Sequence, residues 1–163
     1  MYPVFLTIWR IADEEVAIKV LKTLVDFGAS LDVRSDEWSL LTLSLCYEKT
    51  KIFKFLLESG ANPDVKKPGE EWAPLTYAVH FDLREEATLL LKAGADVEIE
   101  DRNGNTPLID ACRQGLFEMA RILLEEGAYE IDALKMLGGE RGEERDEKMI
   151  DLLLSFSDGD GSE

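Results

Sequence analysis

Pairs of aliphatic residues recur along the chain at intervals of 32 to 34 residues, and a Gly-Ala dipeptide follows each pair after two further residues. The pairs are Leu24-Val25, Leu56-Leu57, Leu90-Leu91 and Leu123-Leu124, and the glycines are Gly28, Gly60, Gly94 and Gly127. Self-similarity at such a period is typical of repeat architectures. Each pair is predicted to end a helix, because a helix terminus commonly needs a left-handed residue, which glycine adopts without a steric clash.

A second recurring position lies 21 residues before each glycine and predicts the start of a first helix in every repeat. It holds Thr7, Ser39, Ala73 and Thr106, and proline follows the last two. A hydroxyl can accept a hydrogen bond from the free amides of a first turn, and proline at the next position removes no donor that the helix needs. Both helices of a repeat are short and could not bury their apolar sides alone, so the repeats are expected to stack into an all-α solenoid.

The fourth repeat carries the most specific motif, which runs from Asp101 to Cys112 with Thr106-Pro107-Leu108 at its centre and continues from Ile122 to Ala128. The third repeat keeps a similar segment from Ala73 to Ala78. These motifs resemble the ankyrin repeat, and the resemblance covers about residues 4–132. It implies an ankyrin-type helical-repeat solenoid with short finger turns and a concave face that commonly receives partners.

The alignment predicts one ankyrin-repeat domain over residues 1–156 and a disordered acidic tail over 157–163. The repeats lie at about 4–35, 36–67, 68–100 and 101–132, and a degenerate repeat at 133–156 caps the stack. In that cap, Asp132 is expected to precede a helix from Ala133 to Leu137, and the segment from Met149 to Leu154 is expected to form a closing helix.

Two departures from the ankyrin pattern change the local expectations. The histidine of the usual Thr-Pro-Leu-His motif is replaced by Arg10, Thr42, Thr76 and Ile109, so the hydrogen bonding there must be rebuilt. The finger through residues 66–71 is longer than its counterparts and should project further, whereas no room for a finger remains after Gly127.

The charge balance restricts the class of partner. Thirty-four acidic residues against 18 basic ones give a formal charge of −16, which repels phosphate backbones and anionic membrane surfaces and attracts basic proteins. The same charge would also serve solubility alone. No signal peptide or membrane-spanning run is recognisable, and only two cysteines are present, so the expected location is a reducing cytoplasm.

Candidate chemistry is sparse along the chain. His80 is the only histidine and has no serine or cysteine nucleophile motif beside it, so it is interpreted as a surface or partner-contacting residue. Cys46 and Cys112 fall two repeats apart and are interpreted as packing residues rather than a disulfide or metal ligands. No enzymatic activity, cofactor or metal is therefore predicted.

The resemblance carries over a set of positions at the finger bases and on the first helices, where ankyrin proteins commonly contact partners. The predicted partner-binding residues are Trp38, Tyr47, Glu48, Glu70, Glu71, Trp72, Tyr77, His80, Phe81, Asp82, Asp110 and Arg113, and the same positions would also expose Leu43, Cys46 and Gln114. Large aromatic side chains ringed by acids are typical of an interface. The alternative is that both tryptophans pack on neighbouring fingers within the stack.

The leading hypothesis is a non-catalytic binding protein, monomeric when free, that captures a basic protein and inhibits or shelters it. Small acidic immunity proteins act in this way on toxic enzymes, and that role is an analogy of size and charge. The alternative is a general adaptor or regulatory subunit that bridges two proteins. An inhibitor should silence its partner's activity, whereas an adaptor should bind two partners at once.

Overall fold

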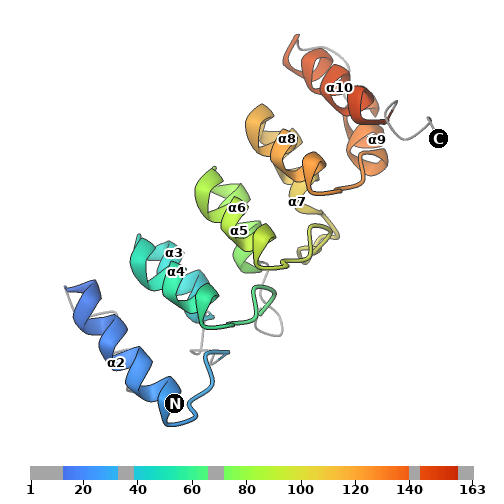
Figure 1. Ribbon diagram of the computed structural model, residues 1–163. Coiled ribbons are helices and arrows are strands. Elements are labelled where there is room, and N and C mark those ends of the chain that lie inside the picture. The colour runs from blue at the N-terminus through green and yellow to red at the C-terminus, as the bar shows by residue number, and fades with distance from the viewer. Residues whose placement is uncertain (1–12, 33–38, 66–71, 140–143, 158–163) are drawn as a thin grey trace.

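The computed structural model describes residues 13–32, 39–65, 72–139 and 144–157, and helices account for most of them. The helices are α2 (Glu14–Asp26), α3 (Leu40–Cys46), α4 (Thr50–Glu58), α5 (Pro74–His80), α6 (Arg84–Lys92), α7 (Pro107–Gln114), α8 (Phe117–Glu125), α9 (Ile131–Gly139) and α10 (Glu144–Ser157). They follow one another in tiers from the N-terminal to the C-terminal end of the molecule (Figure 1). This order agrees with the all-α repeat solenoid that the sequence predicts.

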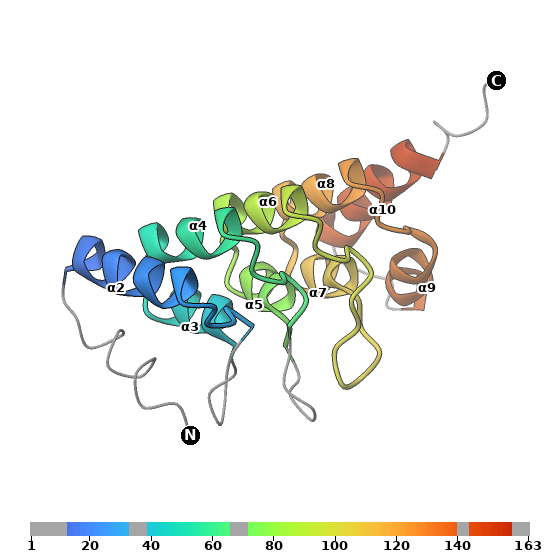
Figure 2. The same cartoon turned by 60° about the horizontal axis from the view of Figure 1, so that its bottom comes forward.

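The helices form two rows (Figure 2). The first helices of the repeats, α3, α5 and α7, contact one another in sequence, and α9 continues their row. The second helices, α2, α4, α6, α8 and α10, form the other row, and each of α4, α6 and α8 also packs on the first helix of its own repeat. The finger between α6 and α7 projects on the side of the first-helix row, so this finger and the first helices share one face (Figure 2).

A single apolar core runs the length of the stack between the two rows. Its largest fully buried side chains include Phe53 from repeat two, Leu75 and Leu90 from repeat three and Met119 from repeat four. Neither short helix of a pair could exclude water alone, so the burial of these side chains depends on the neighbouring repeats. Folding of one repeat is therefore coupled to the next.

The glycines and hydroxyl residues that the repeat pattern singles out lie at helix ends. The four glycines adopt left-handed φ angles between 82° and 91°, and each directly follows the last turn of a second helix. The Ser39 side chain accepts a hydrogen bond from the Thr42 amide, and the Thr106 side chain accepts one from the Ile109 amide. These predicted helix boundaries are confirmed within the described residues.

A ladder of hydrogen bonds joins successive repeats beyond each glycine. The amides of Asn62 and Asp96 donate to the carboxylates of Asp32 and Asp64 in the preceding repeats, at 2.8 Å and 2.9 Å. The Tyr129 amide donates in the same way to Glu98, at 2.9 Å. We call these contacts the carboxylate ladder. It fixes the register of neighbouring repeats with a side chain as acceptor and a backbone amide as donor.

The capping region differs in detail from the sequence prediction. Helix α9 begins at Ile131, so Asp132 lies inside its first turn and does not precede the helix as expected. Ile131 stands where earlier repeats place the ladder carboxylate, so the chain turns directly into a helix there. The closing helix is also longer than predicted, because α10 extends from Glu144 to Ser157.

Three sequence predictions lie outside the described residues: the first helix of repeat one, the longer finger at 66–71, and the tail beyond Ser157. The boundaries between repeats stay predictions.

Candidate functional site

Four aromatic side chains of repeat three gather on one face of α5. Trp72 lies just before the helix, Tyr77 and His80 lie on it, and Phe81 is its C-terminal cap. The Trp72 ring centroid lies 4.5 Å from that of His80 and 5.9 Å and 6.0 Å from those of Tyr77 and Phe81. Residues three and four apart share a helix face, which explains how Tyr77, His80 and Phe81 meet. We call these four residues the aromatic cluster.

The aromatic cluster belongs to the surface of the molecule. Phe81 is 51% exposed, and Trp72, Tyr77 and His80 are partly buried. Among the residues that the structure describes, Trp72 makes its ring contacts with α5 and its cap, inside its own repeat. Tyr47, the position equivalent to Phe81 in repeat two, is 57% exposed. The two repeats therefore present large aromatic side chains at equivalent places.

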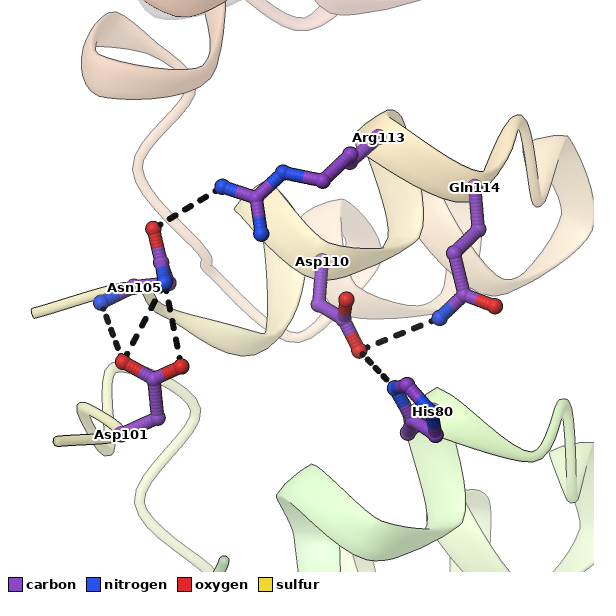
Figure 3. Close-up of polar contacts among 6 residues, drawn as sticks. All are labelled: His80, Asp101, Asn105, Asp110, Arg113 and Gln114. Atoms are coloured by element: carbon purple, nitrogen blue, oxygen red, sulfur yellow. Dashed lines mark hydrogen bonds and ion pairs between the residues drawn. The ribbon is translucent and has the colours of Figure 1, made fainter. Parts of the chain in front are cut away.

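His80 connects the aromatic cluster to repeat four (Figure 3). Its Nδ1 atom lies 3.2 Å from Oδ2 of Asp110 on α7. The Gln114 side-chain amide donates to the same oxygen at 3.1 Å. Asp110 is thus fixed by two side chains, one from each repeat, and helps to hold α5 and α7 together.

Arg113 makes a hydrogen bond to the finger that precedes its own helix, α7 (Figure 3). Its guanidinium donates to the side-chain oxygen of Asn105 at 3.1 Å, and Asn105 donates from its backbone and side-chain nitrogens to Asp101. Burial opposes ionisation of Asp101, but hydrogen bonds from Asn105 and Asn103 outweigh it and lower the pKa of this carboxyl below its usual value. Ionised Asp101 therefore holds the finger in its observed conformation by accepting these hydrogen bonds.

Two acidic residues sit in strained turns between the helices of repeats two and three. Glu48 and Asp82 have φ angles of 53° and 51°, whereas the equivalent residue of repeat four is Gly115, with a φ angle of 72°. The Asp82 carboxylate binds the Arg84 guanidinium through two contacts of 2.7 Å and 2.9 Å. Left-handed backbone is unfavourable for a side chain that carries a Cβ, so an acid at these places costs stability.

Tyr77 links repeat three to repeat two. Burial, a hydrogen bond with Cys46 and the nearby Glu48 carboxylate raise the pKa of the Tyr77 phenol to about 12. The phenol is therefore neutral in the physiological range and remains a hydrogen-bonding group beside the acidic turn. Cys46 and Cys112 are both free thiols, and burial raises the pKa of Cys112 to about 12. Cys112 is therefore protonated and inert under ordinary conditions.

A cavity of about 230 Å³ opens between repeats two and three. Leu45, Phe53 and Leu83 form its apolar lining. Its polar lining consists of Ser44, Thr50, Glu48 and Glu86. We call it the inter-repeat cavity. Glu86 and Thr50 were not among the residues predicted from the sequence, because the spacing of residues along the chain does not reveal a gap between two repeats.

The structure brings together Trp72, Tyr77, His80, Phe81 and Asp110, among the residues that the sequence predicts as a site. Asp82 lies in the turn after α5, next to Phe81 of the aromatic cluster. Tyr47 and Glu48 lie in the equivalent turn of repeat two, and Arg113 lies on the finger side of α7. Trp38, Glu70 and Glu71 lie outside the described residues. The expectation for Leu43 is wrong: it is only 7% exposed, and it lies on a helix that packs against α5 of the next repeat.

Within the described part of the chain, no group of three or more His, Cys, Asp or Glu side chains could hold a metal ion. The helices described there are too short or too polar for any of them to cross a membrane. The polar contacts described above hold helices and a finger in place, and the aromatic side chains Tyr47 and Phe81 remain exposed beside acidic residues.

Stacked helix pairs joined by the carboxylate ladder define the chain as a helical-repeat solenoid. Residues 62–134 match the family described as ankyrin repeats (3 copies). The chain thus carries ankyrin repeats in this segment and has the fold of an ankyrin-repeat solenoid, and ankyrin repeats generally mediate protein–protein interactions.

Similarity to known proteins follows the repeats. Human transient receptor potential cation channel subfamily A member 1 is 38% identical over 105 residues, which are 61% of this chain and 9% of that protein. NF-kappa-B inhibitor alpha of Gallus gallus is 46% identical over 52 residues, 32% of this chain and 16% of that protein. A crystal structure of an ankyrin repeat domain from Acinetobacter baumannii AYE superposes with a TM-score of 0.73 at 22% identity, covering 95% of this chain and 81% of that one. The chain thus spans a small part of these curated relatives and most of the solved domain.

Proposed function

We propose that this chain is a non-catalytic protein-binding module that captures a basic partner through the aromatic cluster and the acids around it. The observation that carries the proposal is the half-exposed Phe81 ring, packed on Trp72 and Tyr77 at the surface next to the acidic turn residue Asp82. Apolar rings that could have been buried in the stack remain open to solvent, which is a feature of interaction sites.

Aromatic side chains suit this role on energetic grounds. Trp, Tyr and Phe bury a large area while few rotatable bonds are frozen, and Trp and Tyr dominate binding energies at interface centres. In this chain the rings also support one another, since Phe81 lies 4.5 Å from Tyr77 and 5.1 Å from His80 by ring centroids. Such mutual packing holds the contact surface in shape before a partner arrives, which lowers the entropic cost of binding.

Electrostatics favours a basic partner. The formal charge of −16 attracts cations over the whole surface, and Glu48, Asp82 and Asp110 lie next to the aromatic cluster. An acidic rim around an apolar centre speeds the encounter with a basic protein and penalises an acidic one. We expect the association rate with a basic partner to fall steeply as salt is added.

Capture of this kind would block or shelter the partner. The name of NF-kappa-B inhibitor alpha describes an inhibitory role for one relative, which supports inhibition as the outcome here. An immunity protein that neutralises a basic toxic enzyme is the concrete form of the proposal, consistent with the acidic charge of the chain.

An adaptor that bridges two proteins is the second candidate. It is favoured by a separate exposed apolar site at the junction of repeat four and the cap, where Tyr129 is 70% exposed and Ile131 is exposed beside it. An adaptor would hold a second protein there while the aromatic cluster holds the first.

The test compares Phe81→Ala with Phe27→Ala, which removes the same ring from a site 87% exposed at the end of α2. The proteins are tagged, checked for folding by circular dichroism and used to capture partners from the native cell, and the affinity for each captured protein is measured. We expect Phe81→Ala to weaken binding by about tenfold or more and Phe27→Ala to leave it unchanged.

Equal retention by both variants would rule out the aromatic cluster as the binding surface. When a partner is lost with Phe81→Ala alone, its activity is assayed with and without this chain. Loss of that activity distinguishes an inhibitor, whereas simultaneous binding of two partners identifies an adaptor.

A further inference from the structure

Asn103 and Gly104 lie in the turn of the finger between α6 and α7. Both residues are exposed, and no atom lies within 4 Å of the place where a side chain would begin on Gly104, so the peptide bond between them is in open space. Asparagine is a thermolabile residue, and glycine after it places no side chain in the way of its own backbone nitrogen. The finger therefore presents a reactive pair of residues to solvent.

The other two asparagines of the chain lack these conditions. Asn62 precedes a proline, whose backbone nitrogen carries no hydrogen to lose. Asn105 precedes a threonine and is partly buried, and both ends of its side-chain amide are occupied. The Asn105 side-chain nitrogen donates to Asp101 at 3.0 Å, and its oxygen accepts from Arg113 at 3.1 Å. Asn62 and Asn105 therefore serve as internal comparisons for Asn103.

Asp101 binds both groups that would react. Its backbone carbonyl accepts a hydrogen bond from the Gly104 amide at 3.2 Å. Its carboxylate accepts one from the Asn103 backbone amide at 2.7 Å and another from the Asn103 side chain. The Gly104 nitrogen and the Asn103 side-chain amide can meet only when these bonds break, so the folded finger opposes their reaction.

We propose that Asn103 is a site of spontaneous deamidation and that Asp101 slows the reaction in the folded protein. The Gly104 backbone nitrogen gives up its proton and attacks the side-chain carbonyl carbon of Asn103. The bond from that carbon to the side-chain nitrogen breaks, and ammonia leaves with the proton. Water then opens the cyclic imide at either carbonyl carbon and leaves aspartate or isoaspartate. Water is the co-reactant, and no electrons are exchanged with another molecule.

Either product changes the finger on the first-helix face of the molecule (Figure 2). Aspartate at position 103 adds a negative charge beside the Asp101 carboxylate, and like charges repel. Isoaspartate adds an atom to the backbone before Gly104, which disrupts the turn bond to the Asp101 carbonyl. In both cases the finger holds Asn105, and through it Arg113, less firmly. This inference is independent of the proposed function.

The test is to age the folded protein at neutral pH in water labelled with heavy oxygen and to map its peptides by mass spectrometry. We expect heavy oxygen in Asn103 and none in Asn62 or Asn105. Asp101→Ala should raise the rate at Asn103 by about tenfold, because hydrogen bonds to a charged group no longer have to break. The control Asp64→Ala also removes a carboxylate that binds a backbone amide, but at another junction, and should react as the wild type does.

Each variant is first checked for folding by circular dichroism, and the ageing is repeated in urea. There the wild type and Asp101→Ala should react at the same rate, because the finger is no longer formed. Reaction at Asn62 or Asn105 as fast as at Asn103, or no reaction at Asn103 in either protein, would overturn the site. Equal rates in the folded wild type and Asp101→Ala, or equal acceleration by Asp64→Ala, would overturn the protective role of Asp101.

Discussion

Thr42 and Thr76 occupy equivalent positions in two repeats, but within the described parts of the chain only the Thr42 hydroxyl has a hydrogen-bond partner. The Thr42 hydroxyl lies 2.9 Å from the Ser39 hydroxyl, which also caps α3. In repeat three the capping position is Ala73, and the Thr76 hydroxyl, 3% exposed, has no hydrogen bond among the described residues. The hydrogen bond that replaces the one made by histidine in the usual Thr-Pro-Leu-His motif is therefore present in repeat two and missing, among the described residues, in repeat three.

Ala73→Ser should restore this pair in repeat three. The new hydroxyl would accept a bond from the first turn of α5 and pair with Thr76, so the free energy of unfolding should rise by about 1 kcal/mol. Urea denaturation measures the change. The reverse substitution, Ser39→Ala in repeat two, should lower stability by a similar amount, and an Ala73→Ser protein no more stable than the wild type would contradict the interpretation.

At Glu48 we expect a substitution to increase stability for a different reason, which is relief of backbone strain. Glu48→Gly should remove the strain of its left-handed backbone and raise the free energy of unfolding by about 1 kcal/mol, less the added flexibility of the unfolded chain. Thermal denaturation followed by circular dichroism is sufficient to detect this. Glu48→Ala removes the same charge but keeps the Cβ, so it should not stabilise, and equal gains in both variants would point to charge instead of backbone strain.

The finger before α7 shows how one element depends on an ionised group. The pKa of Asp101 is lowered in the folded state relative to its usual value of 3.8. A lowered folded pKa means that the carboxylate stabilises the protein above the unfolded value, and that this contribution disappears as the pH falls through the folded pKa. Asp101→Asn should therefore be less stable than the wild type at neutral pH, with the difference shrinking below pH 3.8.

Chemical denaturation of both proteins at neutral pH and at about pH 3 measures this change. A difference that stays constant across the range would mean that the shape of the Asp101 side chain, and not its charge, holds the finger.

Helix ends could be predicted from the sequence, whereas contacts between repeats could not. Gly127 and Thr106 act through bonds within a few residues of themselves, so their sequence signals are local. The ladder carboxylates Asp64 and Glu98 act on the following repeat, about 30 residues away. An acidic residue recurs four positions after Gly28, Gly60 and Gly94, but its position in the sequence does not show that its carboxylate binds the next repeat instead of facing solvent.

The candidate site was predictable to a similar extent. Tyr77, His80 and Phe81 follow from helix periodicity on α5, so their common face could be inferred. Leu43 was misplaced because its burial depends on how α3 packs in the stack, which helix periodicity alone does not show. Glu86 was missed for the converse reason, since a gap between repeats leaves it at the wall of a cavity.

At the scale of the whole molecule, the charge of −16 opposes folding into a compact stack. Salt screens this repulsion, because the Debye length falls from about 30 Å at 0.01 M to about 3 Å at 1 M. The melting temperature should therefore rise with sodium chloride concentration over that range. A scan at several concentrations measures the rise, and a falling melting temperature would show that attractive ion pairs outweigh the repulsion.

The carboxylate ladder has a consequence for how such a chain can change in length during evolution. Repeat three carries one donor amide at Asp96 and one acceptor at Glu98, and the donor belongs to the backbone, so it makes no demand on the side chain there. A tandem duplication of that repeat by unequal recombination would pair the amide of the new copy with the carboxylate of the old one. Each junction would be complete at once, without compensating substitutions, while Ile131 would still end the series at the cap.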